Sequence, residues 1–125
     1  MTKKLQILVA EDVESNYLYL KAVLKKMNAN IIWVKNGQEA IDMVDENPNI
    51  DLILMDMLMP NVNGFEATAT IKMTHPEIKI VAQTAFAMHE DREKALACGC
   101  DAYLAKPIRA EDLLQMVRMQ TVNKK

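Results

Sequence analysis

Short hydrophobic runs alternate along the chain with longer segments in which polar and apolar positions are mixed. The runs are nearly continuous rather than alternating, they are rich in Ile, Leu and Val, and turn-forming residues flank them. Runs of this kind are typical of strands buried on both faces of a sheet. We therefore expect five strands, at residues 5–10, 31–34, 52–55, 78–82 and 102–105.

The segments between the runs have the period of amphipathic helices. The first carries apolar residues every three or four positions, along one face of a helix: Val13, Tyr17, Leu20, Leu24 and Met27. Four further helices are expected around residues 40–44, 64–71, 88–97 and 113–117.

Local signals mark several ends of these helices. Asn36 and Asn63 are each followed three positions later by a glutamate, Glu39 and Glu66, which is the pattern of a capping box. Gly99 is placed to end the fourth helix. Five strands that alternate with five helices predict an α/β domain whose parallel sheet is covered on both faces, although the pattern alone leaves the strand order open.

Reactive side chains follow four of the five predicted strands. Glu11 and Asp12 follow the first run, Asp56 the third, Thr84 the fourth and Lys106 the fifth. Each taken alone has an ordinary role, such as Asp12 capping the next helix. In an open parallel sheet, however, ligands bind at the carboxyl ends of the strands, so one shared site explains all five positions together.

The residue types at this edge point to phosphoryl chemistry with a metal ion. Three carboxylates repel one another unless a cation or a proton intervenes, and oxygen ligands of this kind suit Mg²⁺. Lys106 can pair with a phosphate, and Thr84 offers a hydroxyl donor. Asp56, at the end of an apolar strand, can act as a nucleophile and form an aspartyl phosphate.

Composition narrows the classes of protein. The chain has 125 residues, of which 50% are hydrophobic and 26% charged, which is typical of one soluble globular domain. Its formal net charge of −2 argues against a nucleic acid or an anionic membrane as a partner. No segment has the length of a signal peptide or membrane span, and we interpret Cys98 and Cys100 as thiols of a reducing cytosol, so we expect a cytoplasmic protein.

Four motifs together resemble the receiver domain of two-component response regulators. They are Ala10-Glu11-Asp12, Met55-Asp56-Met57-Leu58-Met59-Pro60 with Gly64 four residues later, Thr84-Ala85, and Lys106-Pro107. The resemblance extends from Leu5 to Val122 and implies a flavodoxin-like, doubly wound sheet of order 2-1-3-4-5. It also implies that residues 1–125 form a single receiver domain, with no kinase core or DNA-binding domain in this chain.

The resemblance assigns roles at the metal and the phosphate. Asp56 is expected to accept the phosphoryl group. Asp12, Asp56 and the backbone carbonyl of Leu58 would ligate Mg²⁺, and Glu11 would act on the metal through water. Glu11 stands where many members of the family have Asp, so its side chain reaches one methylene further toward the metal.

Further roles are implied on the last two strands. Thr84 would move toward the phosphate, Lys106 would form a salt bridge to it, and Tyr103 would be the aromatic switch. The Lys106-Pro107 peptide bond is expected to be cis. Phosphorylation would then change the surface formed by the fourth helix, the fifth strand and the fifth helix, by shifting the populations of two states.

Two large apolar residues are expected to flank the phosphate. They are Leu58 and Phe86, the second residue after Thr84. We expect them to hinder an attacking water and to lengthen the life of the phosphoryl group. The resemblance therefore implies a phosphoacceptor with slow autodephosphorylation rather than an enzyme.

Other proteins share parts of this pattern. Aspartyl-phosphate phosphatases have a second acid two residues after the nucleophile, where this chain has Leu58. An FMN carrier of similar fold needs a phosphate-binding loop after the first strand, where Glu11 and Asp12 would repel phosphate. A purely structural domain would not need the five-residue site.

Within the family, two origins stay open. The length fits a free-standing regulator, whereas the segments around Glu11, Asn36 and Lys106 resemble receivers of hybrid sensor histidine kinases. In both cases the expected phosphodonor is a histidine kinase or a histidine phosphotransfer domain. The output would reach a downstream protein or the rest of a longer parent chain.

Overall fold

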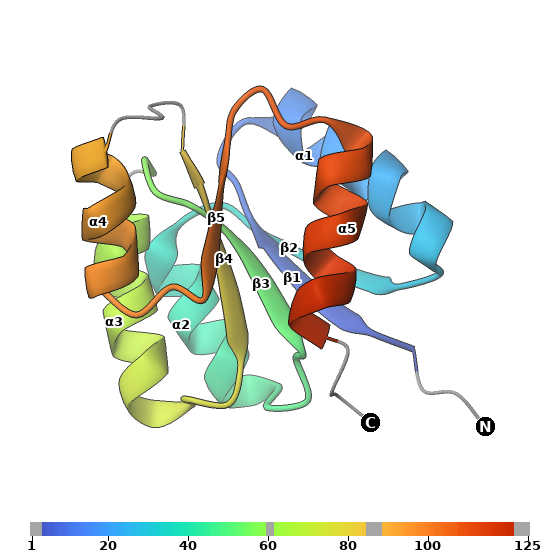
Figure 1. Ribbon diagram of the computed structural model, residues 1–125. Coiled ribbons are helices and arrows are strands. Elements are labelled where there is room, and N and C mark those ends of the chain that lie inside the picture. The colour runs from blue at the N-terminus through green and yellow to red at the C-terminus, as the bar shows by residue number, and fades with distance from the viewer. Residues whose placement is uncertain (1–3, 60–61, 85–88, 122–125) are drawn as a thin grey trace.

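A parallel five-stranded sheet lies between two layers of helices (Figure 1). The computed structural model describes residues 4–59, 62–84 and 89–121, with residues 89–92 described by their backbone alone. The strands are β1 (Gln6–Ala10), β2 (Asn30–Val34), β3 (Leu52–Asp56), β4 (Lys79–Thr84) and β5 (Ala102–Ala105). The helices are α1 (Glu14–Leu24), the 3₁₀ turn η1 (Lys25–Met27), α2 (Gly37–Glu46), α3 (Gly64–Thr74), α4 (His89–Ala97) and α5 (Ala110–Thr121).

The strand order is β2-β1-β3-β4-β5, which confirms the doubly wound arrangement. Helices α1 and α5 cover one face of the sheet, and α2, α3 and α4 cover the other (Figure 1). The predicted strands are all present, and Asp56 ends β3 as expected. Strand β4 extends further than expected, so Thr84 is the last residue of a strand rather than the first residue of a loop.

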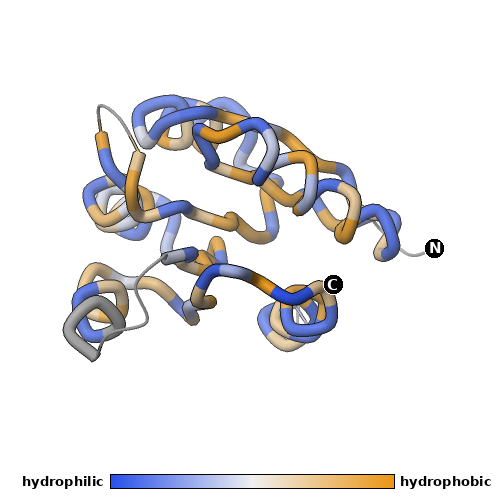
Figure 2. The backbone as a smooth tube through the Cα atoms, turned by 90° about the horizontal axis from the view of Figure 1, so that it is seen from above, coloured by the Kyte–Doolittle hydropathy of each residue, from blue (hydrophilic) through white to orange (hydrophobic). Residues whose placement is uncertain are grey.

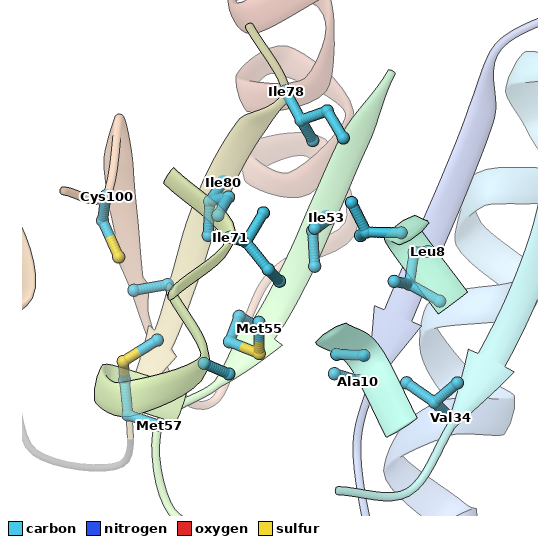
Figure 3. Packing of buried hydrophobic residues seen from close by; sticks show 14 of the residues in the cluster. Leu8, Ala10, Val34, Ile53, Met55, Met57, Ile71, Ile78, Ile80 and Cys100 are labelled. Atoms are coloured by element: carbon cyan, nitrogen blue, oxygen red, sulfur yellow. The ribbon is translucent and has the colours of Figure 1, made fainter. Parts of the chain in front are cut away.

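The side chains of the central strands alternate between two hydrophobic cores. In β1, Ile7 and Val9 pack with residues of α1 and α5, whereas Leu8 and Ala10 pack with residues of α2, α3 and α4. All four are fully buried. Figure 3 shows the second of these clusters from close by. Burial on both faces explains why the strands read as continuous apolar runs.

The helices expose one side and bury the other, and hydrophilic and hydrophobic stretches alternate along their turns (Figure 2). No helix in the part of the chain that the structure describes is long and apolar enough to cross a membrane.

Both predicted capping boxes begin helices. The Asn36 side chain accepts a hydrogen bond from the Glu39 N–H at 2.8 Å, and Asn63 accepts one from the Glu66 N–H at 3.0 Å. Glu39 also accepts a bond from the backbone N–H of Lys35 at 2.8 Å. These bonds satisfy N–H groups that have no partner within the helix.

The start of α1 differs from the prediction. Val13 is the residue before the helix and is 45% exposed, so its expected place on the buried face is wrong. Val23 is buried there instead, beside Leu20 and Leu24. Asp12 does not cap the helix, because the cap position belongs to Val13 and has no side-chain hydrogen bond.

Gly64 brings the start of α3 directly against the end of β3. A Cβ atom at this position would lie 2.4 Å from the carbonyl oxygen of Asp56 and 2.7 Å from the Cα of Met57. The Gly64 N–H donates a hydrogen bond to the Met57 carbonyl at 3.2 Å. The backbone around Asp56 is thus fixed by a contact that only glycine permits.

Replacing Gly64 with alanine should destabilise the fold by about 1–3 kcal/mol, because the new methyl group overlaps backbone atoms of β3. Urea unfolding at equilibrium measures the change. Met73→Ala, on the exposed face of the same helix, is the matched control and should shift stability by no more than about 0.5 kcal/mol. Equal stabilities for the two variants would contradict the close approach.

Candidate functional site

Three carboxylates meet at the carboxyl ends of the two central strands. Glu11 and Asp12 follow β1, and Asp56 ends the neighbouring β3. Each offers an oxygen atom, and these atoms all lie within 4.8 Å of one another. Glu11 and Asp56 are buried, with exposed fractions of 0% and 5%, whereas Asp12 is exposed. The site is thus a recessed pair of acids with a third acid at its mouth.

Lys106 lies between the two buried acids. Its Nζ is 3.2 Å from Oδ2 of Asp56 and 3.4 Å from Oε1 of Glu11. The lysine follows β5, and its backbone N–H donates to the carbonyl of Thr84 at 2.7 Å. The following Lys106–Pro107 bond is cis, as the resemblance implied. One cation thus faces two buried anions.

Backbone donors orient both buried carboxylates. The N–H of Leu58 donates to Oδ1 of Asp56 at 3.1 Å, and the N–H of Val13 donates to Oε2 of Glu11 at 3.2 Å. Trp33, at the end of β2, donates its indole N–H to the backbone carbonyl of Glu11 at 2.7 Å. Trp33 is not among the site residues predicted from the sequence, and only its position near the end of a strand could have indicated it.

Burial raises the pKa of Glu11, and the negative charge of Asp56 raises it further. The ammonium group of Lys106 and the N–H of Val13 oppose this shift without cancelling it. A further cation nearby would stabilise the ionised form of a carboxyl group whose pKa is raised in this way.

The donor set fits a hard divalent cation. Carboxylate oxygens are ligands that Mg²⁺ prefers, and Mg²⁺ keeps several waters, which the exposed side of Asp12 would leave room for. Among the residues that the structure describes, these three acids form the only group of metal-binding side chains that are close enough to share an ion.

Thr84 and Tyr103 face the same side of the sheet. Tyr103 pairs with Ala82 in the β4–β5 register, and Ala82 lies two residues before Thr84. Side chains two residues apart in a strand share a face. Thr84 is buried, and Tyr103 is half-buried against the core beneath α2, α3 and α4. A movement of Thr84 toward the site would therefore be felt on the face that Tyr103 occupies.

A pocket of about 590 Å³ opens beside the acids, between α1 and the segment after β5. It is lined by Glu11, Asn16, Tyr19, Leu20, Gln83, Lys106, Pro107 and Ile108. Gln83 is 1% exposed, and its Nε2 has no hydrogen-bond partner among the described residues. This pocket is not predictable from local sequence patterns, because its lining comes from distant segments. The predictions for Pro60, Ala85 and Phe86 lie outside the described residues.

Residues 7–118 match the family model of the response regulator receiver domain. The chain belongs to this family. Among curated relatives, a hybrid signal transduction histidine kinase of Dictyostelium discoideum is 43% identical over 114 residues, which cover 87% of this receiver and 8% of that protein. The polar-differentiation response regulator DivK of Brucella anthropi is 34% identical over 116 residues, covering 90% of this receiver and 92% of that protein. The receiver thus spans a small part of the first relative and nearly all of the second.

Two solved receiver domains share the fold and part of the sequence. One comes from a sensor histidine kinase of Pseudomonas aeruginosa and has a magnesium ion in its active-site cleft. It is 29% identical, with a TM-score of 0.89, and the match covers 97% of this chain and 100% of that one. The other is the receiver of a Saccharomyces cerevisiae response regulator in a co-crystal with a histidine phosphotransfer protein. It is 31% identical, with a TM-score of 0.87 and coverage of 94% and 89%.

The raised pKa of Glu11 should make the stability of the metal-free receiver depend on pH. In the folded state the Glu11 carboxyl group binds its proton more tightly than a carboxyl group with the ordinary pKa of 4.5 does. The stability that Glu11 contributes is therefore present below pH 4.5 and is lost as the pH rises through the raised pKa. Relative to Glu11→Gln, the wild type should lose free energy of unfolding over this range, as measured by urea unfolding with a chelator present.

Two controls accompany this measurement. Glu14→Gln changes an exposed glutamate of α1 and should leave the pH dependence of the wild type unaltered. Addition of Mg²⁺ at neutral pH should stabilise the wild type more than Glu11→Gln. A stability difference between Glu11→Gln and wild type that stays constant with pH would contradict the raised pKa.

Proposed function

We propose that this receiver, as a single domain over residues 1–125, accepts a phosphoryl group on Asp56 from a phosphohistidine of another protein or domain. The observation that carries the proposal is the pairing of a buried Asp56 carboxylate with Lys106 at the end of β3. A buried nucleophile with one cation against it and further acids beside it suits transfer of an anionic group in the presence of a metal.

The metal in this proposal is Mg²⁺. Asp12, Asp56 and the backbone carbonyl of Leu58 would hold it, and Glu11 would act through water. When bound, the ion supplies positive charge to the transferring phosphoryl group and lowers the repulsion among the acids. The acidic cluster supports this assignment, and so does the magnesium ion in the cleft of the Pseudomonas aeruginosa relative.

The transfer needs little from the protein beyond position and charge. An oxygen of the Asp56 carboxylate attacks phosphorus, the N–P bond of phosphohistidine breaks, and its electron pair stays on the imidazole nitrogen. Asp56 loses no proton in this step, because it reacts as a carboxylate. The Leu58 N–H, which donates to Oδ1, fixes the orientation of the nucleophile.

The product is recognised by Lys106 and Thr84. Lys106 already contacts Asp56 and would pair with a phosphoryl oxygen, while the Thr84 hydroxyl would donate to another. The inward position of Thr84 would favour an inward Tyr103, which lies on the same face of the sheet. The altered surface of α4, β5 and α5 would be the output of the domain.

The phosphodonor must approach through the mouth of the site, because Asp56 itself is buried. Two exposed apolar side chains follow the acids of the site in the sequence: Val13, next to Asp12, is 45% exposed, and Leu58, two residues after Asp56, is 56% exposed. A histidine kinase or histidine phosphotransfer domain would contact this rim, and the yeast relative crystallised with a phosphotransfer protein supports that class of partner. The output would pass to a downstream protein or, in a hybrid kinase, to the rest of the parent chain.

Other classes of function fit the residues less well. The exposed Leu58 stands where a phosphatase of this chemistry would have its second acid. The buried Glu11 stands where a flavin carrier would bind phosphate. The receiver would therefore act as a phosphoacceptor with slow autodephosphorylation, and it would do so in the cytoplasm. Its net charge of −2 argues against nucleic acid or a membrane as a partner of this domain.

Asp56→Asn should abolish phosphorylation, because the amide is a far weaker nucleophile than the carboxylate. The protein is incubated with acetyl phosphate and Mg²⁺, and its intact mass is recorded. The wild type should gain one phosphoryl group, and omission of Mg²⁺ should suppress that gain.

Asp42→Asn is the matched control for this experiment. Asp42 is an exposed aspartate of α2 that accepts a hydrogen bond from Gln38 and lies outside the acidic cluster, so its replacement should leave phosphorylation unchanged. A phosphoryl adduct on Asp56→Asn, or none on the wild type, would refute the proposed acceptor.

Leu58→Asn should shorten the life of the phosphoryl group several-fold. The apolar side chain lies two residues after Asp56 at the mouth of the site, where it hinders an attacking water, and an amide can instead hold that water by a hydrogen bond. The decay of the phosphorylated mass after removal of acetyl phosphate gives the rate. Leu18→Asn, at a similarly exposed leucine of α1 (52%, against 56% for Leu58), should decay like the wild type. Equal lifetimes for all three proteins would refute the role of Leu58.

A further inference from the structure

Cys98 and Cys100 form a close pair of thiols in the turn between α4 and β5. Their Sγ atoms are 3.9 Å apart, and both thiols are free. The chain has no other cysteine. Gly99 between them has φ +111°, in the left-handed region that glycine adopts without strain, and this conformation lets the turn bring the two side chains together.

The two residues are within reach of a disulfide. Residues two apart on a chain have Cα atoms no more than about 7 Å apart, and a disulfide needs about 4.4–6.8 Å. Cys100 is anchored, because its N–H donates to the Ala95 carbonyl at 3.2 Å and the N–H of Asp101 donates to Ile80 at 2.8 Å. The Cys98 N–H likewise donates to the Lys94 carbonyl at 3.1 Å. Closing the gap to the bond length of about 2 Å would therefore fall to rotation of the two side chains, in which the Cys98 thiol gives up its hydrogen bond to the Ala95 carbonyl at 3.0 Å.

The two thiols differ in access and in charge. Cys98 is half-buried, whereas Cys100 is 6% exposed and lies at the edge of the core shown in Figure 3. A hydrogen bond from Cys100 lowers the pKa of Cys98 to about 7, and Lys94 adds to this effect. The same hydrogen bond and burial raise the pKa of Cys100. Cys98 is thus the accessible thiolate and Cys100 the protonated neighbour.

We propose that Cys98 and Cys100 are a reversible dithiol–disulfide site whose oxidant is a low-molecular-weight disulfide such as glutathione disulfide. This site is separate from the phosphoacceptor and does not depend on the proposed function. A bound metal fits the pair less well, because a structural zinc site takes four ligands and no third metal-binding side chain joins the thiols among the described residues.

The exchange proceeds in two balanced steps. The Cys98 thiolate attacks one sulfur of glutathione disulfide, forming a mixed disulfide and releasing one glutathione thiolate. Cys100 then loses its proton to solvent and attacks the Cys98 sulfur, which releases the second glutathione. Two electrons pass from the protein to the oxidant. Because the mixed disulfide removes the charge on Cys98, it also removes one cause of the raised pKa of Cys100.

The test uses glutathione disulfide because the chain's ten methionines would also consume peroxide. The reduced protein is incubated with it, remaining thiols are blocked with a maleimide, and the intact mass is recorded. The wild type should lose two hydrogens and take up no maleimide, and dithiothreitol should restore the starting mass. Cys100→Ser should stop at one stable glutathione adduct, on Cys98.

Cys98→Ser measures the order of attack. Its remaining thiol is buried, and burial alone still raises its pKa, so the adduct should form several-fold more slowly than on Cys100→Ser. Because Cys100 is buried, Cys100→Ala is made as well, and circular dichroism confirms which variants are folded.

The proposal has clear contrary outcomes. A wild type that stops at a glutathione adduct, that fails to react, or that forms only dimers whose yield rises with protein concentration would overturn it. Equal adduct rates on Cys98→Ser and Cys100→Ser would overturn the assignment of Cys98 as the attacking thiol. Asp56→Asn should oxidise like the wild type, so this result is independent of whether phosphorylation occurs.

Discussion

The burial of two carboxylates side by side is the constraint on which the rest of this structure depends. Glu11 and Asp56 are removed from water at the ends of the two central strands, and Lys106 lies against both. Burying charge is costly unless partners compensate, and one lysine cannot neutralise two acids. The raised pKa of Glu11 records that deficit. A divalent cation stabilises a site with unmet negative charge, so the way the fold places these acids suits a metal ion.

The fold maintains this arrangement through rigid neighbours. The parallel sheet brings β1 and β3 together, so that acids 45 residues apart in the chain share one edge. Gly64 packs the start of α3 onto the backbone of Asp56, and the indole of Trp33 holds the carbonyl of Glu11. Because both strands are buried on both faces, neither acid can move away from the other without disturbing a core. The repulsion between the two carboxylates therefore persists in the folded state, and a cationic ligand would relieve it.

The sequence predicted most of the fold, because strands buried on both faces read as apolar runs and helix caps are local signals. The capping bonds of Asn36 and Asn63 depend on residues three positions away, which a pattern can capture. Val13 was placed wrongly because helical period alone cannot tell the last residue before a helix from its first turn. Trp33 and the pocket around Gln83 were missed for another reason: their significance lies in contacts between distant segments, on which local periodicity carries no information.

In the proposed mechanism, the metal ion and the phosphoryl group both act on the net charge of the same site. Three ionised acids and one lysine leave two negative charges, which one divalent cation would neutralise. Phosphorylation replaces the single charge of Asp56 with about −1.5 to −2, so some excess returns even with the metal bound. In this mechanism that excess would be met by donors that move closer, and the two candidates are Thr84, which ends β4, and Lys106, which follows β5. Such a movement of Thr84 toward Asp56 would be felt on the face of the sheet that Tyr103 occupies. Phosphorylation of Asp56 at the end of β3 is therefore expected to change the packing around β5.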